Sequence, residues 1–245
     1  MDITMNCKLV LMAVYLLLVG FLISCEGQPN RQYDYFRLAL RWPNSYCRSN
    51  NCRQTVPQYF TIHGLWPQKN DGSELSNCNT TEQLTDALLN NFKSDLPNYW
   101  PDLSTTYFEA SKGFWRYQWT KHGSCSSSKF KPSQWVERAI TLTKTHDVLS
   151  MLKKAGILPN GASYTTSKIL KAIQDGTSKP ADIVCNKDKN GNMYLFEVRL
   201  CFDYDANAIT NCQNKARQCD AGRNPIFPST PRPTNITTGQ SAGFN

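Results

Sequence analysis

The sequence predicts an α+β fold in a single disulfide-linked domain, on the strength of three observations. Strand-like and helix-like segments are mixed without the repeating strand–helix rhythm of a parallel α/β sheet. No Gly-rich phosphate-binding loop follows any strand candidate. Eight of the ten cysteines lie beyond an N-terminal leader, and an even number suits disulfides formed in an oxidising compartment.

The first 27 residues are typical of a secretory signal peptide and are set apart from the fold. Residues 9–23 are apolar except for one glycine, and this run is shorter than the roughly 20 residues of a membrane span. The small residues Cys25 and Gly27 stand at the −3 and −1 positions of a cut before Gln28. A membrane anchor is the alternative, but no basic cluster follows the apolar run. We therefore expect a secreted, extracellular protein without a membrane segment.

The chain beyond the leader is basic. Removing the leader takes one basic and two acidic residues from totals of 27 and 19, which leaves 26 and 17 and a formal charge of +9. A basic exported protein is attracted to polyanions such as nucleic acid, acidic glycans and anionic membranes. Composition alone does not choose among these partners.

Two strand candidates stand in the first half. Residues 33–42 are apolar and aromatic, and a Pro-Asn turn follows them. Residues 58–65 form the second candidate, in which His63 precedes an expected Gly-Leu-Trp-Pro turn. The polar, Asn-rich residues 69–81 predict a surface loop, and this loop carries a glycosylation sequon at Asn79.

Helical periodicity is found in three further segments, residues 85–92, 133–154 and 164–173. The long segment repeats apolar residues every three to four positions and stops before Gly156. His146 falls within it, and we interpret this histidine as structural or surface-exposed. The last segment begins near a Thr-Thr pair and is expected to end at Asp175-Gly176.

Residues 193–203 alternate well and predict the clearest strand of the second half. From residue 228 onward the chain is rich in Pro, Ser, Thr and Gly and has almost nothing to bury, so we expect a disordered tail over residues 228–245. A second sequon lies in it at Asn235. The folded domain is therefore expected over residues 28–227, and no internal repeats are found in it.

The cysteines of the domain suggest four disulfides. They are Cys47, Cys52, Cys78, Cys125, Cys185, Cys201, Cys212 and Cys219. Eight cysteines allow 105 pairings, and the sequence alone does not select one. A zinc site is the alternative, since His122 and Cys125 have a ligand-like spacing, but no Cys-x-x-Cys pair exists.

The segment FWRYQWTKHGSC, residues 114–125, sets a second histidine in an aromatic context like that of His63. On a helix, Trp115 and Trp119 share one face, and Gln118 and His122 share another. Packing explains the tryptophans but leaves the polar face of Gln, Lys and His without a structural reason. A disulfide between the end of this segment and the loop holding Cys78 would bring the two histidine segments together.

Two histidines and a lysine are sufficient to cleave RNA without a metal or other cofactor. One imidazole removes the proton from the ribose 2′-OH, and the other protonates the departing 5′-oxygen. Lysine offsets the negative charge that builds on the phosphoryl oxygens. Histidine suits both tasks because its ordinary pKa of about 6.5 allows either protonation state near neutrality.

The two histidine segments, FTIHGLWP at residues 60–67 and FWRYQWTKHGSC, resemble the active-site segments of the T2 family of secreted ribonucleases. The likeness extends over most of the mature chain, and it includes the Trp-Pro-x-x-x-Cys sequence at 42–47 and Ile-Phe-Pro at 226–228. Within that family the basic charge, short chain and sequons resemble the pistil S-ribonucleases of plant self-incompatibility.

The resemblance implies a role for each matching residue. His122 matches the catalytic base and His63 the catalytic acid. Lys121 matches the lysine that stabilises the charged transition state. Trp66 matches an aromatic side chain that stacks on one base of unpaired RNA, and Phe114 matches a contact to the other base. Both aromatic side chains have a plausible alternative role in the core.

The family also implies an antiparallel sheet flanked by helices, together with a disulfide pairing. The implied bridges are Cys47–Cys52, Cys78–Cys125, Cys185–Cys219 and Cys201–Cys212. One departure stands out, because the family commonly has His-Glu where this chain has Tyr117 and Gln118. We place Tyr117 among the substrate-binding side chains and Gln118 beside the reacting phosphate, one helical turn before His122. The change puts catalytic efficiency in doubt more than the chemistry.

Three functions remain open at this stage. The first is an active S-type endoribonuclease acting on single-stranded RNA, a monomer whose partners would include pollen F-box proteins. The second is a nutritional or defence ribonuclease, a type that is more often acidic. The third is a catalytically weakened relative that acts as a binding or storage protein, which the residues at 117 and 118 would allow.

Overall fold

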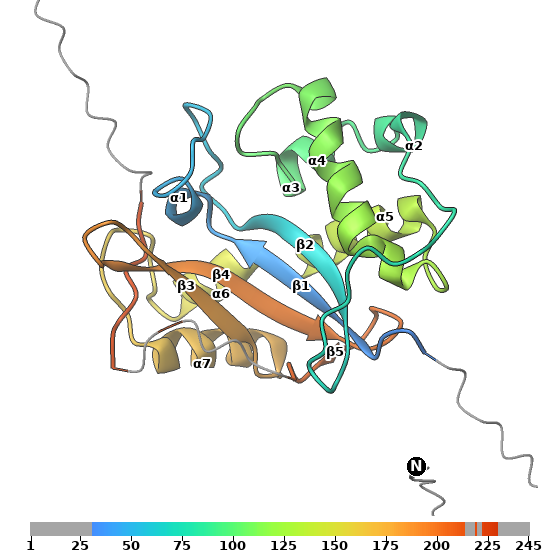
Figure 1. Cartoon of the computed structure of the whole chain (residues 1–245). Coiled ribbons are helices and arrows are strands. Elements are labelled where there is room, and N and C mark those ends of the chain that lie inside the picture. The colour runs from blue at the N-terminus through green and yellow to red at the C-terminus, as the bar shows by residue number, and fades with distance from the viewer. Residues whose placement is uncertain (1–30, 214–218, 220–221, 230–245) are drawn as a thin grey trace, which may run out of the picture. The chain divides into compact units, whose positions relative to one another are not determined.

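An antiparallel sheet forms the centre of the fold, with its main strands in the order β2-β1-β4-β3 and β5 paired to β4. The strands are β1 (Tyr35–Arg41), β2 (Thr61–Gln68), β3 (Asp182–Lys187), β4 (Met193–Phe202) and β5 (Ile209–Thr210). Figure 1 shows helices flanking this sheet. The predicted α+β class is confirmed.

The computed structural model describes residues 31–213, 219 and 222–229. The expected signal peptide and the sequon at Asn235 lie outside the described residues, as does the tail from residue 230 onward. The described residues from Gln32 onward belong to one compact unit. Pro228 is buried within it, and its carbonyl accepts a hydrogen bond from Trp42 Nε1 (2.8 Å). Packing therefore continues just past the expected end of the domain at residue 227.

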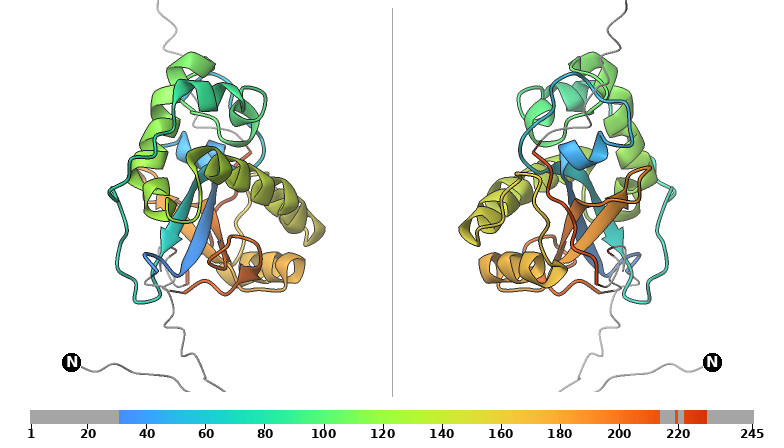
Figure 2. Two further views of the ribbon diagram at one scale, coloured as in Figure 1. Left: turned by 90° about the vertical axis from the view of Figure 1, so that its right-hand side faces the viewer. Right: turned by 90° about the vertical axis from the view of Figure 1, so that its left-hand side faces the viewer.

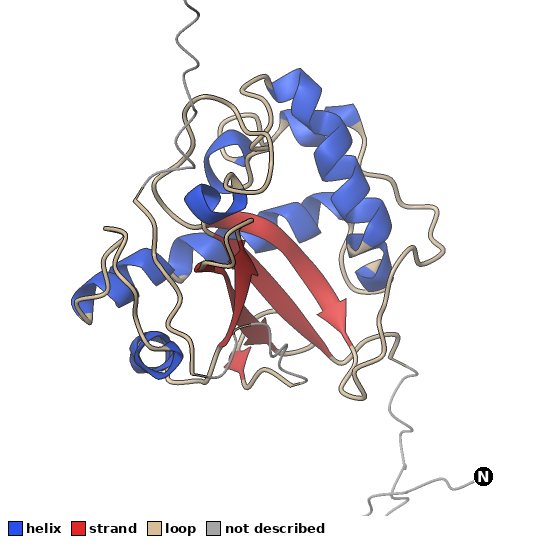
Figure 3. Cartoon of the chain, turned by 60° about the vertical axis from the view of Figure 1, so that its left-hand side comes forward, coloured by secondary structure: helices blue, strands red, loops and turns tan. Residues whose placement is uncertain are grey.

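The helices lie around the strands (Figure 3). They are α1 (Pro43–Tyr46), α2 (Asp86–Asn90), α3 (Leu96–Tyr99), α4 (Phe108–Lys121), α5 (Pro132–Thr145), α6 (Val148–Lys154) and α7 (Thr166–Thr177), with a 3₁₀ helix, η1 (Gly123–Ser126). In the side views α5 and α7 lie on the same side of the sheet (Figure 2). None of the described helices has both the length and the apolar character needed to cross a membrane.

The alternation of side chains along the strands divides the sheet into an apolar face and a charged face. On the apolar face Leu38, paired with Leu65 of β2 and Leu200 of β4, is fully buried. Trp135 of α5 covers this face and donates its indole N–H to the carbonyl of Leu65 (3.0 Å). The opposite face carries charged side chains from β1, β3 and β4, among them Arg41. The functional site is built on this charged face.

The second strand differs from its prediction. It was expected over residues 58–65 with a turn after His63, but β2 runs to Gln68 and includes the whole Gly-Leu-Trp-Pro segment. The proline is tolerated because β2 is an edge strand, where a missing N–H costs no sheet hydrogen bond on the open side. The predicted turn is therefore wrong.

The long helix expected over residues 133–154 is two helices. α5 ends at Thr145 with His146 as its C-cap, and Asp147 caps the start of α6 by accepting a hydrogen bond from the N–H of Ser150 (3.1 Å). His146 donates its Nδ1–H to the carbonyl of Leu142 (2.9 Å), which confirms a structural role for this histidine. α7 also differs from expectation, because it continues through Asp175-Gly176 to Thr177.

Several short elements were missing from the sequence prediction, namely α1, α3, β3 and β5. The disulfides, in contrast, pair as the family resemblance implies: Cys47–Cys52, Cys78–Cys125, Cys185–Cys219 and Cys201–Cys212. Because Cys125 is held in a disulfide, it is not available as a zinc ligand beside His122.

Candidate active site

His63 occupies an irregularity in β2. Ile62 pairs with Leu40 of β1 and Gly64 pairs with Ala39, so His63 is an extra residue with no partner on β1. Such a bulge re-aims a side chain out of the regular alternation. Here it directs the imidazole toward the charged face, where Nδ1 lies 2.7 Å from Oε2 of Glu197 on β4.

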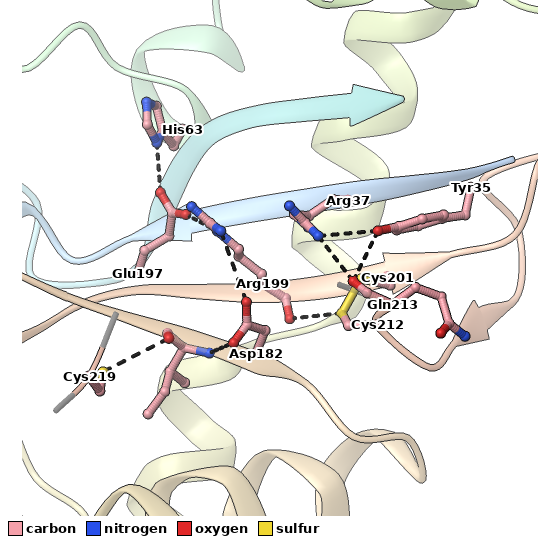
Figure 4. A network of polar contacts seen from close by, with 11 residues as sticks. Tyr35, Arg37, His63, Asp182, Glu197, Arg199, Cys201, Cys212, Gln213 and Cys219 are labelled. Carbon is pink, nitrogen blue, oxygen red and sulfur yellow. Dashed lines mark hydrogen bonds and ion pairs between the residues drawn. A yellow bond between two sulfur atoms is a disulfide. The ribbon is translucent and has the colours of Figure 1, made fainter. Parts of the chain in front are cut away.

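Glu197 is a buried carboxylate with both oxygens in use. Oε2 faces His63, and Oε1 accepts from Arg199 Nε (2.5 Å), while Arg199 also lies 4.0 Å from Asp182 on β3 (Figure 4). Burial alone would raise the pKa of Glu197, but its interactions with His63 and Arg199 outweigh burial and lower it. The carboxylate is therefore ionised near neutrality.

His122 stands where α4 ends and η1 begins. The Cys78–Cys125 disulfide and a backbone hydrogen bond from Asn77 N–H to Lys121 O (2.8 Å) tie this junction to the loop that follows β2. Burial, the charge of Lys121 and the charge of His63 together lower the pKa of His122 to about 4. His122 is consequently neutral at neutral pH and able to accept a proton.

Trp66 lies against both imidazoles. Its ring centroid lies 5.0 Å from that of His63 and 5.2 Å from that of His122. It is the one tryptophan of the six that is not buried. Each histidine is followed by a glycine, and an indole packs against each glycine. A Cβ at Gly64 would lie 2.0 Å from Trp66 Nε1, and a Cβ at Gly123 would lie 2.5 Å from Trp119. Glycine at these two positions lets the indoles approach the backbone.

The other predicted site residues belong to α4 and differ in exposure. Lys121 is half-buried, and its Nζ lies 5.6 Å from the ring centroid of Tyr117, which is 55% exposed. Phe114 is half-buried, packs against the core and lies 5.9 Å from the buried guanidinium of Arg41. Gln118 is buried, and its Oε1 has no hydrogen-bond partner among the described residues. Gln118 was expected beside the reacting phosphate on the polar face of the helix, but its side chain is buried.

The sequence reasoning did not identify Glu197 and Arg199 as site residues. A signal was present, because the two residues stand two apart in a strand that is otherwise almost wholly apolar, and so they face the same side. Opposite charges at that spacing inside a buried strand indicate a paired, functional or structural ion cluster. Among the described residues, no three His, Cys, Asp or Glu side chains are grouped as a metal site requires.

Comparisons with known proteins identify the family of this chain. The model of the Ribonuclease T2 family matches residues 33–212. Ribonuclease S-7 of Nicotiana alata is 36% identical over 200 residues, which cover 80% of this chain and 89% of that protein. The chain belongs to the ribonuclease T2 family, and it is an S-ribonuclease-like member of it.

Two solved structures are similar to the chain over most of their length. RNase NT in complex with 5′-AMP has a TM-score of 0.72 at 30% identity, with 80% of this chain and 98% of that chain covered. The gametophytic self-incompatibility-associated SF11-RNase of Nicotiana alata has a TM-score of 0.70 at 31% identity, with 80% and 99% covered. The disulfide-linked antiparallel fold is thus that of T2-type ribonucleases.

Proposed function

We propose that this chain is a secreted endoribonuclease that cleaves single-stranded RNA by transphosphorylation and leaves 2′,3′-cyclic phosphate ends. One observation carries the proposal: two imidazoles with different surroundings both lie against the indole of Trp66. His122 is half-buried next to the cation Lys121, and His63 is held by a carboxylate. The first setting favours a neutral ring, as a base requires, and the second orients the His63 ring with one nitrogen toward the carboxylate and the other left to deliver a proton, as an acid requires.

The reaction follows from these protonation states. Neutral His122 removes the proton of the ribose 2′-OH, and the 2′-oxygen attacks the adjacent phosphorus. The bond from phosphorus to the 5′-oxygen breaks, and that oxygen takes a proton from His63. Lys121 stabilises the charge that develops on the phosphoryl oxygens. The tyrosine at position 117 supports Lys121 through its ring face, where the family commonly has a histidine.

Trp66 and Phe114 are the proposed base-binding side chains. The indole of Trp66 is partly exposed beside both histidines, so a base next to the scissile phosphate can stack on it. Phe114 is half-buried on the same helix as Lys121 and is the proposed contact for the second base.

RNA digestion by the purified protein tests the proposed reaction. We expect cleavage to continue unchanged in EDTA, because two imidazoles and a lysine supply the base, the acid and the positive charge. The first product is expected to carry a 2′,3′-cyclic phosphate, identified by mass spectrometry of a cleaved dinucleotide. Inhibition by EDTA that a divalent ion reverses would contradict the proposal, and so would a first product ending directly in a 3′-phosphate.

A pH profile tests the place of Gln118 in the site. The kcat/KM of the wild type is expected to be bell-shaped, with an acid limb near pH 4, where His122 becomes protonated. The change Gln118→Glu puts a carboxylate one helical turn from His122, which favours the protonated imidazole and raises the pKa of His122. The acid limb should therefore move to higher pH.

Gln118→Leu is the matched control, because it fills similar space without adding charge. Its acid limb should stay where the wild type has it, whatever happens to the rate. Superimposable profiles for Gln118→Glu and the wild type would mean that position 118 is electrostatically remote from both histidines, and its place in the site would have to be withdrawn.

For the biological role, the proposed assignment is the pistil S-ribonuclease of gametophytic self-incompatibility. The support is the similarity to Ribonuclease S-7 and the SF11-RNase, together with the basic charge of the mature chain. Secretion rests on the N-terminal signal peptide, and a glycan at Asn79 fits the exposure of that side chain. In this role the protein acts as a monomer, and pollen F-box proteins are its expected partners.

Tissue distribution separates this role from the second candidate, a nutritional or defence ribonuclease. Transcript confined to the pistil supports the self-incompatibility role, whereas expression in roots, leaves or senescing tissue supports the alternative. The weakened binding or storage protein is separated from both by the RNA digestion described above, since it would leave RNA intact.

A further inference from the structure

The charged face of the sheet carries a chain of ion pairs that ends on a proposed catalytic group. Asp182 of β3 lies against Arg199 of β4, Arg199 donates to Glu197, and Glu197 contacts His63 of β2. Figure 4 shows these side chains in sequence across three strands. The strands are fixed in register by their sheet hydrogen bonds, so this row of ion pairs has little freedom to rearrange.

Glu197 is buried without exposure to solvent, whereas the side chain of His63 is 30% exposed. A buried carboxylate is costly unless both of its oxygens are paired, and here His63 and Arg199 pair them. An ionised carboxylate only accepts hydrogen bonds, so the atom facing it must carry a proton. Nδ1 of His63 is therefore the N–H of the neutral ring, and Nε2 is the atom left to exchange a proton.

We propose that Glu197 is a positioning residue for His63, which fixes the Nδ1–H tautomer and stabilises the protonated ring that donates to the leaving 5′-oxygen through Nε2. Arg199 and Asp182 hold Glu197 in place from the other side. This inference rests on the proposed function for the acid role of His63. The contact itself is a property of the folded chain and can be tested without substrate.

The charges that face this pair come from every strand around it. Arg199 of β4 contacts Glu197 directly, and Arg41 of β1 lies opposite Glu197 in the sheet and interacts with it electrostatically. His122 interacts electrostatically with His63, and Trp66 lies against both rings. Arg199 helps to keep Glu197 ionised. Among the described residues, Glu197 is the only negatively charged side chain paired with the His63 ring.

The first test is the tautomer of His63 in the wild-type protein, read by ¹⁵N NMR of histidine-labelled protein with the ring neutral. The resonance is assigned by its loss in His63→Asn. We expect the Nδ1–H form, although free histidine prefers Nε2–H. In Glu197→Gln the Nε2–H form should rise, because Arg199 only donates and keeps the single amide oxygen, which leaves the NH2 group facing Nδ1 of His63 as a donor.

The second test is the pH profile of kcat/KM. Glu197→Gln removes the negative charge that lies 2.7 Å from the His63 ring, so the alkaline limb should move to lower pH. Each pH unit of that movement lowers kcat/KM about tenfold at pH values above the limb. The loss should fall on kcat rather than KM. Glu197→Asp keeps the charge and should restore the limb, and Glu137→Gln, the same change at an exposed position of α5, should leave the profile unchanged.

Three results would overturn the proposal. One is an Nε2–H ring in the wild type, a measurement that needs no variant to fold. Another is a folded Glu197→Gln protein whose profile superimposes on the wild type, and the third is an equal shift in Glu137→Gln. The tautomer is measured without RNA, so the two tests are independent. A protein that failed to cleave RNA would refute the proposed function, and the spectrum would still show whether Glu197 fixes the tautomer of His63.

Discussion

Asparagine in place of either His63 or His122 is expected to reduce RNA cleavage by about 10²–10⁴-fold while the fold remains intact. Each variant removes one proton-transfer group. Without His122 no base takes the 2′-OH proton, and without His63 the 5′-oxygen must leave without a proton from the enzyme. Asparagine is smaller and uncharged, so it fits both positions. The measurement is kcat/KM on a dinucleotide at the pH optimum, with circular dichroism to verify folding.

The third histidine provides the matched control. His146 lies at the end of α5, where its Nδ1–H is bonded to Leu142 and its ring packs edge-on against Phe202. Neither contact involves the indole that lies against the two catalytic candidates. His146→Asn should retain wild-type kcat/KM. Wild-type turnover in a folded His63 or His122 variant, or an equal loss in His146→Asn, would refute the two-histidine mechanism.

The sequence predicts the parts of this fold that depend on local periodicity. The strand over 193–203 alternates between apolar and polar positions, and the structure places β4 there. The helical pattern over 133–154 is also real, but its phase continues across His146 and Asp147. The break there comes from one side chain capping the next helix, a local event that apolar spacing does not register. Periodicity therefore finds elements better than their ends.

The candidate site was predicted less completely, because it is assembled across strands that are far apart in the chain. His63 and Glu197 are separated by 134 residues, and their contact depends on the order β2-β1-β4 and on one bulge in β2. Strand order and pairing register both depend on contacts between distant segments, and a single sequence does not specify them. Family resemblance supplied the histidines and the disulfides but no partner for His63.

Removing the Cys78–Cys125 disulfide is expected to cause the largest loss of stability. The bridge closes a loop with a sequence separation of 47, so by the chain-entropy estimate its loss costs about 4 kcal/mol of unfolding free energy. For a domain of this size, that corresponds to a drop of about 8–16 °C in Tm. The bridge also holds the junction at His122 against the loop after β2, so kcat/KM should fall as well.

The Cys47–Cys52 bridge is the control within the same chain. Its sequence separation is only 5, so the same estimate gives about 2 kcal/mol. Neither cysteine belongs to the segments that carry His63 and His122. Paired Cys→Ala variants of each bridge, compared by urea unfolding and by dinucleotide cleavage, measure the two effects side by side.

The Cys78→Ala/Cys125→Ala protein should lose more free energy of unfolding, and it alone should lose activity at a temperature where both are folded. If removing Cys47–Cys52 cost more free energy of unfolding, the loop-closure estimate for Cys78–Cys125 would be refuted. If activity survived the removal of Cys78–Cys125, the histidine junction would be held by the backbone hydrogen bond of Asn77 and the packing of Trp119 instead.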